Sequence, residues 1–348
     1  MSTDAPTPKR PLRDALRLGL KALSVLIVCA IATFALYWFV PEQGDYARAV
    51  VIKHERLTSI EGEKVVLIGG SNLAYGIDSP LIERATSCPV VNMGMNGFFG
   101  VRYMLEEVRP HVNAGDTIVI ALETDSFFKP VEGTSSNLLL VVKELPEAFG
   151  YLTWQQRLGL AAAMPYVAQQ KILRLIRSAA FGLRDALIGA DQDPPGRSDL
   201  MTDIETADGF APNGDLVSHL GIDWQMSRDQ GVPADAPINP TLIPLLQQYQ
   251  SEMAARGVRV MISYTPLERS FYERYRDGLD GVEQAMRDAG LNVVSSVRDY
   301  VYDESFFFDT VFHLNAEGRP LRSERLAADI NAFRDAPCVP GPQPGVTQ

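Results

Sequence analysis

The chain contains 348 residues, of which 46% are hydrophobic and 22% are charged, and its formal net charge is −11. This balance describes a globular protein rather than a disordered one, with room for one large domain or two small ones. Residues 1–21 carry five basic and two acidic side chains, so the rest of the chain carries −14. An acidic domain argues against nucleic acid as a partner, because phosphate binding needs a basic face.

Residues 22–40 form a run of 19 residues without a charged side chain, and its end is aromatic. At the rise of an α-helix this run spans roughly 28 Å, about the thickness of a hydrocarbon core. We predict a transmembrane helix there, preceded by a cytoplasmic basic tail and followed by a juxtamembrane connector at 41–63 that contains a short helix. The positive-inside rule places the remainder outside the cytoplasm. A cleaved signal peptide is the alternative, because Ala30 and Ala32 form a small-x-small pattern.

Two parts of the chain alternate short apolar runs with helical patterns. We predict strands at 64–68, 90–92, 117–122, 258–264 and 292–294, and helices at 101–108, 240–256, 278–289 and in a last segment that ends near Phe333. Strands that alternate with helices indicate the α/β class and a parallel sheet. The predicted α/β domain extends over 64–334, and a Pro/Gly-rich tail follows at 335–348.

The alternation stops between residues 131 and 240. Residues 154–188 have helical spacing of apolar side chains, and we expect Pro165 to break or kink this helix. Residues 212–215 read Pro-Asn-Gly-Asp, which is a turn signal. We interpret 131–240 as a partly helical insertion that shapes or covers the active site.

A serine follows the first predicted strand. Four apolar residues, Val65 to Ile68, lead directly into Gly69, Gly70 and Ser71. A serine at this place has its hydroxyl at the carboxyl edge of the sheet, where open α/β sheets hold their sites, and glycines let a substrate approach. Ser71 is therefore a candidate nucleophile. The alternative is a strand-turn-helix junction in which Ser71 only caps a helix.

A serine nucleophile needs a base, and the chain has only four histidines. Three of them, His54, His111 and His219, lie in the connector, before a turn and in the insertion. His313 follows Asp309 by four residues, and a carboxylate at that distance can orient an imidazole from a tight loop. His313 is therefore the candidate base. The alternative is that Asp309 caps a turn and His313 is an ordinary, partly buried side chain.

The predicted extracytoplasmic part contains two cysteines, Cys88 and Cys338. An oxidising compartment permits a disulfide between them, and two unpaired thiols are the alternative. The chain has no paired His/Cys spacing of the kind that binds metal, so we predict no metal site and no cofactor.

This order of motifs resembles the SGNH (GDSL-like) hydrolase family over residues 65–128 and 258–330. The resemblance implies a flavodoxin-like three-layer α/β fold. It also implies that Ser71 is the nucleophile and that Asp309 and His313 complete a catalytic triad. The oxyanion hole would then contain the N–H groups of Ser71 and of Gly94, which matches the glycine of the second block.

The chain departs from the family pattern in three places. Gly-Gly-Ser replaces the usual Gly-Asp-Ser, and one extra residue separates the aspartate from the histidine. The third block, commonly Gly-x-Asn-Asp, corresponds to a stretch that contains Glu123 and Asp125. Ionised carboxylates cannot donate a hydrogen bond to an oxyanion. Either Asn96 or Asn72 takes over this role, or the hole has only backbone donors, or the site is weakened.

The motif details and the single N-terminal anchor resemble one branch of that family more closely. It contains membrane-anchored alginate-type O-acetyltransferase components and the DltD-like proteins of teichoic-acid D-alanylation. The resemblance implies a bacterial inner-membrane protein with a periplasmic domain that acts on an acyl ester or a glycan. It also implies a multi-pass membrane acyltransferase as partner. The alternatives are a periplasmic esterase or deacetylase, and a non-catalytic subunit that binds glycan or scaffolds a biosynthetic complex.

Overall fold

The computed structural model describes residues 10–39, 46–188, 204–224, 226, 237–334 and 336–339. The chain divides into two compact units. Residues 1–43 and 159–194 form the first, which we call the helical unit. Residues 44–158 and 195–348 form the second, which we call the α/β unit. The loop predicted at 191–199 and most of the tail at 335–348 lie outside the described residues.

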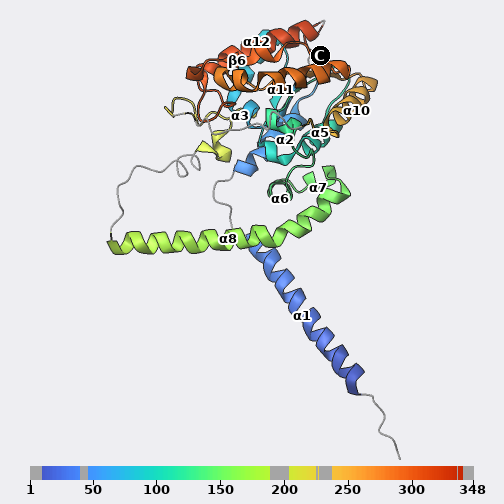
Figure 1. Ribbon diagram of the computed structural model, residues 1–348, viewed down its shortest axis with the longest axis vertical. Helices are drawn as coiled ribbons and strands as arrows, with labels where there is room; N and C mark the ends of the chain where they lie inside the picture. The colour runs from blue at the N-terminus through green and yellow to red at the C-terminus, as the bar shows by residue number, and fades with distance from the viewer. Residues whose placement is uncertain are drawn as a thin grey trace, which may run out of the picture. The chain divides into compact units, whose positions relative to one another are not determined.

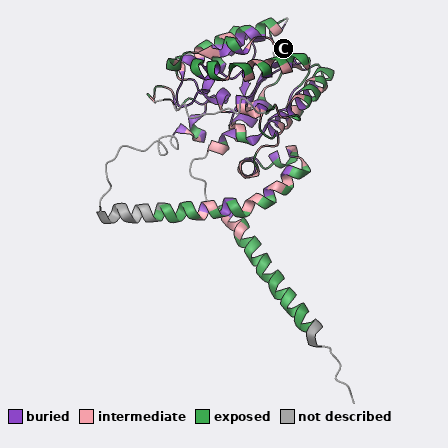
Figure 2. Ribbon diagram, in the orientation of Figure 1, coloured by how far each residue is buried: buried purple, intermediate pink, exposed green. Residues whose placement is uncertain are grey.

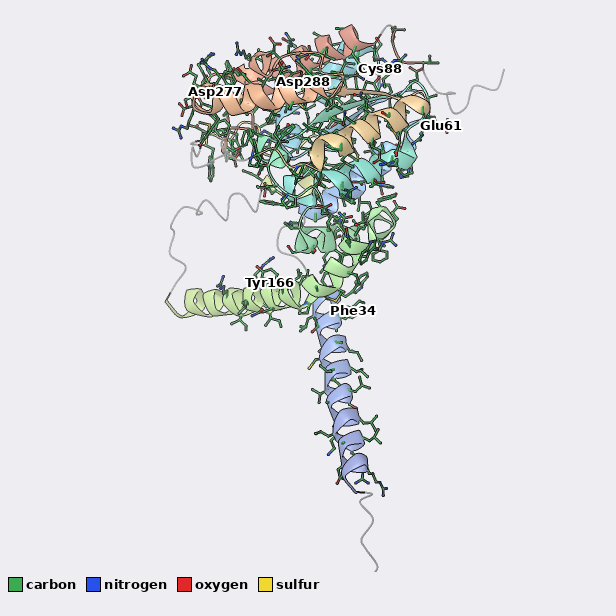
Figure 3. The ribbon with its side chains drawn as sticks, turned by 45° about the vertical axis from the view of Figure 1, so that its right-hand side comes forward. Phe34, Glu61, Cys88, Tyr166, Asp277 and Asp288 are labelled. Carbon is green, nitrogen blue, oxygen red and sulfur yellow. A yellow bond between two sulfur atoms is a disulfide. The ribbon has the colours of Figure 1, made fainter. Side chains whose placement is uncertain are left out.

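The helical unit begins with α1 (Arg10–Phe39). Residues 13–39 of this helix have a mean hydropathy of 2.2 and are long and apolar enough to cross a membrane, a property that signal sequences share. Figure 3 shows side chains projecting from all sides of α1, with Phe34 in its C-terminal half. Residues 10–21, predicted as a tail, are helical instead, because their Leu, Ala, Arg and Lys residues favour helix and extend the apolar segment.

Helix α8 (Trp154–Ile188) contains Pro165 but does not break there. Of the predicted break or kink, the break does not occur, because a proline removes one backbone hydrogen bond and the flanking helical residues retain the others. Within the helical unit, Lys171 of α8 donates from Nζ to the backbone oxygen of Tyr37, at 2.7 Å. This bond joins α8 to the C-terminal end of α1.

A four-stranded parallel sheet forms the centre of the α/β unit. Its strands are β1 (Val65–Gly69), β2 (Val90–Asn92), β3 (Thr117–Ala121) and β4 (Arg259–Ile262). The spatial order is β2-β1-β3-β4. The strand predicted at 292–294 is reduced to one parallel bridge between Val293 and Ile262. It stops there because the Ser296 side chain caps a 3-10 turn that begins at Val297.

Helices and short turns surround the sheet (Figure 1). Before and between the first three strands lie η1 (Tyr46–Arg48), α2 (Ala49–Ser59), α3 (Ser71–Gly76), α4 (Ser79–Thr86), η2 (Gly97–Phe99), α5 (Val101–Val108) and η3 (Arg109–His111). After β3 come η4 (Thr124–Phe127), α6 (Ser135–Glu144), α7 (Ala148–Tyr151), η5 (Ala207–Gly209) and α10 (Leu242–Ala255). The last elements are β5 (Leu267–Glu268), α11 (Arg269–Asp288), η6 (Val297–Tyr300), β6 (Val301–Tyr302), η7 (Glu304–Phe306) and α12 (Gly318–Phe333).

Alternation along the strands builds a core on each face of the sheet. Val65 and Leu67 of β1 belong to a cluster that includes Ile82 of α4 and Ile330 of α12. The intervening β1 residues are equally buried, and α5 contacts β1. Figure 2 shows the strands as buried segments among helices with exposed outer sides. Burial on both faces explains why the strands are continuous apolar runs.

A disulfide between Cys88 and Cys338 joins the start of β2 to the segment after α12. The two residues are 250 positions apart in the sequence, and Cys88 is labelled in Figure 3. Of the two alternatives from the sequence, the structure therefore contains the paired form. Both cysteines lie in the same apolar cluster as α4 and α12.

In the predicted insertion, α6, α7 and the first residues of α8 belong to the α/β unit, and the rest of α8 belongs to the helical unit. The described part of the α/β unit resumes at Ile204. Phe210 and Leu216 form an antiparallel bridge around the predicted turn, where Gly214 has a φ of +93°. Lys53 of α2 fixes this turn: its buried ammonium donates to the backbone oxygens of Asn92 and Gly214. Burial lowers the pKa of Lys53 to about 7.

Candidate active site

Two polar side chains follow the two central strands. Ser71 is the first residue of α3, just after β1, and Glu123 lies two residues beyond β3. In the sheet, β1 lies between β2 and β3, so the chain passes from β1 to β2 on one side of β1 and then returns to β3 on its other side. The carboxyl ends of two such strands flank a crevice in open α/β sheets, and ligands bind there.

The structure brings Ser71, His313 and Asp309 together, although 242 residues separate the serine from the histidine. Ser71 Oγ lies 2.8 Å from His313 Nε2. The other ring nitrogen, Nδ1, lies 2.8 Å from Asp309 Oδ1. His313 and Asp309 are buried, with exposed fractions of 8% and 5%. This is the geometry of a hydroxyl, a base and a carboxylate that orients the base.

A tight hairpin explains why an aspartate and a histidine four residues apart can meet. Phe307 and Leu314 form an antiparallel bridge, and the Phe308 N–H donates to the backbone oxygen of His313. The chain therefore doubles back between Asp309 and His313. At its tip the Thr310 hydroxyl oxygen accepts the N–H of His313, at 3.2 Å.

Tyr75 supports the imidazole from one face. Its ring stacks on His313 with centroids 4.0 Å apart and planes 2° from parallel. The Tyr75 hydroxyl donates to Glu205 of the insertion, at 2.9 Å. Burial opposes a charge on His313, but the facing carboxylates of Asp309, Glu123 and Glu205 outweigh burial and raise its pKa. The environment therefore favours the imidazolium form, which a general base must reach during catalysis.

Arg322 of α12 holds the residue that follows the serine. It is fully buried and donates to both the backbone oxygen and the side-chain oxygen of Asn72. The Asn72 amide group in turn donates to the backbone oxygen of Ala121 at the end of β3. The Asn72 side chain is therefore committed to holding α3 in place and does not supply the missing oxyanion donor.

Gly94, predicted as an oxyanion donor, is not placed for that role. Its N–H donates to Asn92 Oδ1, at 3.0 Å. A Cβ on Gly94 would lie 2.4 Å from that of Leu73, so the glycine is needed for close packing under α3. The physical reason is that the Asn92 side chain, at the end of β2, already accepts the N–H of Gly94 two residues further along. Gly94 is also missing from the lining of the cavity described below.

Asn96 and Asp125 lie on the wall of a cavity that also contains Ser71 and His313. Asn96 Oδ1 accepts the N–H of Phe98 and so caps η2. Asp125 forms an ion pair with Lys129. These contacts lie away from the serine, so both residues belong to the periphery of the site.

Glu123 lies directly against the serine. Its Oε1 accepts the Ser71 hydroxyl at 2.7 Å and the Asn72 N–H at 3.1 Å. Glycines make room for the carboxyl group: a Cβ on Gly70 would lie 2.5 Å from it, and one on Gly97 2.4 Å from its Oε2. The side chain that the sequence marked as a departure from the family pattern is therefore a direct partner of the candidate nucleophile.

The cavity in front of these residues has a volume of about 540 Å³. Its wall includes Tyr46 of η1, Phe98 of η2, Gly133 and Thr134 of the insertion, and Phe312 of the hairpin. Glu205, also from the insertion, contributes a third carboxylate beside Glu123 and Asp125. Within the described residues the structure shows no group of three or more His, Cys, Asp or Glu side chains that could hold a metal ion.

The other histidines are engaged elsewhere. His54 lies between Glu107 and Glu147, and His111 lies 3.0 Å from the Tyr151 hydroxyl. His219 is buried with Nε2 3.1 Å from the backbone oxygen of Leu314, and burial lowers its pKa to about 3. None of the three lines the cavity that contains Ser71.

Comparison of the sequence with protein-family models and with curated proteins returned no match. Sequence reasoning missed Tyr75, Glu205 and Arg322, because stacking on His313 and bonding to Asn72 depend on segments far apart in the chain. The only available signal was the Tyr-Gly pair that closes α3, and it does not specify a partner.

Proposed function

We propose that this protein is a membrane-anchored serine acyl-ester enzyme of the SGNH type. The observation that carries the proposal is the alignment of Ser71, His313 and Asp309 beside a cavity. A hydroxyl with a base at 2.8 Å, and a base oriented by a buried carboxylate, is the arrangement that nucleophilic acyl transfer requires.

The proposed reaction has two halves. His313 Nε2 takes the proton of Ser71 as Oγ forms a bond to the ester carbonyl carbon, and the carbonyl π electrons move to oxygen. The tetrahedral intermediate collapses, its ester C–O bond breaks, and the leaving oxygen takes the proton from His313. An acceptor hydroxyl, or water, then attacks the acyl-Ser71 by the same steps in reverse. Asp309 keeps Nδ1 protonated and stabilises the imidazolium.

The topology of the sheet supports the resemblance to the SGNH family. The order β2-β1-β3-β4 is that of the first four strands of flavodoxin-like sheets, and Val293 forms a bridge on the free edge of β4, where the fifth strand would lie. The serine after β1 and the Asp-His hairpin before the last helix follow the block order of that family.

We further propose O-acyl transfer, of acetyl above all, to or from a cell-surface polysaccharide, in the periplasm of a bacterial cell. An apolar helix that is long enough for an anchor supports a membrane location, and a disulfide supports an oxidising compartment. Hydrolysis of the same esters would use the same acyl-enzyme. The acceptor, and a multi-pass acyltransferase as partner, rest on the family resemblance.

Turnover of an aryl acetate by the full chain tests the proposal. We expect turnover by the wild type, and we expect Ser71→Ala to lose about 10⁴-fold or more while its melting temperature is kept. Product analysis with an acetylated and a free glycan then separates transferase from hydrolase. Full activity of Ser71→Ala would end the proposal. No turnover by the wild type would favour a non-catalytic subunit, which the carboxylate of Glu123 beside Ser71 also favours.

A further inference from the structure

Glu123 Oε1 occupies a place that an acyl-ester enzyme needs for its substrate. The atom lies 2.7 Å from Ser71 Oγ and accepts the N–H of Asn72. A carbonyl oxygen attacked by Ser71 would lie close to that same N–H. In the proposed reaction the Asn72 N–H would be a backbone donor to the oxyanion, at the position that the carboxylate of Glu123 occupies in this structure.

The two short contacts of Ser71 set the number of protons in the site. The hydroxyl has one proton, yet Oγ lies within hydrogen-bond distance of both His313 Nε2 and Glu123 Oε1. If Ser71 donates to an ionised Glu123, His313 must donate to Oγ, and it is then an imidazolium because Nδ1 also bonds to Asp309. If Ser71 donates to a neutral His313, Glu123 must be a carboxylic acid. Both arrangements contain the same single extra proton.

We propose that His313 and Glu123 share this proton through the Ser71 hydroxyl, and that acyl transfer begins only when the proton is on Glu123. This inference rests on the proposed function. In that state His313 is a free base that can accept the Ser71 proton. Glu123 is neutral, so a substrate carbonyl can displace it from the Asn72 N–H, and its O–H can donate to the developing oxyanion. With Glu123 ionised, a negative charge would face the oxyanion and oppose its formation.

Other charged groups around Glu123 come from several elements. Asp309 lies behind His313, Glu205 faces the cavity from the insertion, and Tyr46 faces it from η1. Arg322 of α12 lies behind Asn72, and Asp125 on Glu123's own loop is paired with Lys129. The carboxylates that face His313 raise its pKa, and the Arg322 guanidinium adds a positive charge behind Asn72.

A shared proton makes the rate of acyl transfer fall at both low and high pH. Removal of the shared proton leaves Glu123 ionised, and addition of a second proton leaves His313 without basicity, so the wild-type rate is bell-shaped in pH. Glu123→Gln removes the alkaline limb and leaves the sigmoid of a single base. Over the pH range of that limb, we expect the ratio of the variant's kcat/KM to that of the wild type to grow about tenfold for each pH unit.

The experiment measures kcat/KM for an aryl acetate from pH 4.5 to 9, with the full chain and with Ser71→Ala as the blank. Glu123→Asn is the second variant, and melting temperatures verify the fold of each protein. Asp125→Asn is the matched control on the same loop, and its profile should keep the alkaline limb. An alkaline limb in both Glu123 variants, or its loss in Asp125→Asn, would overturn the inference. So would variants that stay below the wild type at every pH. A wild type without Ser71-dependent turnover would instead overturn the proposed function.

Discussion

The α/β unit contains two buried histidines that each face carboxylates, and they differ in what else they touch. His313 pairs with Asp309 and reaches a hydroxyl on the wall of a cavity. His54 of α2 lies between Glu107 of α5 and Glu147, at the start of α7. Facing carboxylates raise the pKa of both imidazoles.

The difference lies in what surrounds each histidine, because both have carboxylates beside them. The His54 ring packs edge-on against His111, with centroids 5.0 Å apart, and its partners come from three helical elements. This arrangement ties α2, α5 and α7 together. His313 also faces carboxylates, but its second nitrogen is directed at the Ser71 hydroxyl on the wall of a cavity. We therefore expect a structural role for His54, and the chemical role proposed above belongs to His313.

Matched glutamine substitutions test this assignment with the largest expected effect. His313→Gln removes the acceptor of the Ser71 proton, and we expect kcat for an aryl acetate to fall by about 10⁴-fold to 10⁶-fold. His54→Gln should stay within about threefold of the wild type, because its contacts lie away from the cavity. Steady-state kinetics of both variants provide the measurement. Comparable losses in the two variants would erase the distinction.

For stability the expectation is reversed: His54→Gln should have a pH-dependent effect on the free energy of unfolding, and this effect is smaller. A histidine whose folded pKa is raised stabilises the protein fully below its unfolded value of about 6.5, and this contribution is lost as the pH rises through the folded pKa. We expect His54→Gln to lose unfolding free energy relative to the wild type at pH 5.5, and to lose less at pH 8.5. Urea unfolding at both pH values measures this. A deficit that grows with pH would contradict the interpretation.

The sequence was sufficient to predict the elements that carry Ser71, Asp309 and His313. Apolar runs predicted three strands to within one residue at each end, and the place of each of the four histidines in the chain left His313, which follows Asp309 by four residues. These inferences use local pattern and the rule that parallel strands end at one edge. They did not need the path of the intervening insertion.

The other contacts of the site could not be predicted, because they depend on side-chain directions that the sequence pattern does not reveal. Gly94 follows β2 as expected, but the bond from its N–H to Asn92 depends on a rotamer that spacing does not reveal. Arg322 reaches Asn72 from 250 residues away, and no local pattern marks a buried arginine. Glu123 was recognised as a departure, whereas its contact with Ser71 depends on where the loop after β3 turns.

The most direct test of the central claim is covalent labelling of the folded, full-length protein with a fluorophosphonate, followed by mass-spectrometric mapping of the adduct. Such probes react with a serine whose proton is accepted by a neighbouring base. We predict one adduct, on Ser71, with labelling lost in His313→Gln and kept in His54→Gln. An unlabelled wild type, or an adduct on Ser71 that forms equally well without His313, would contradict the account.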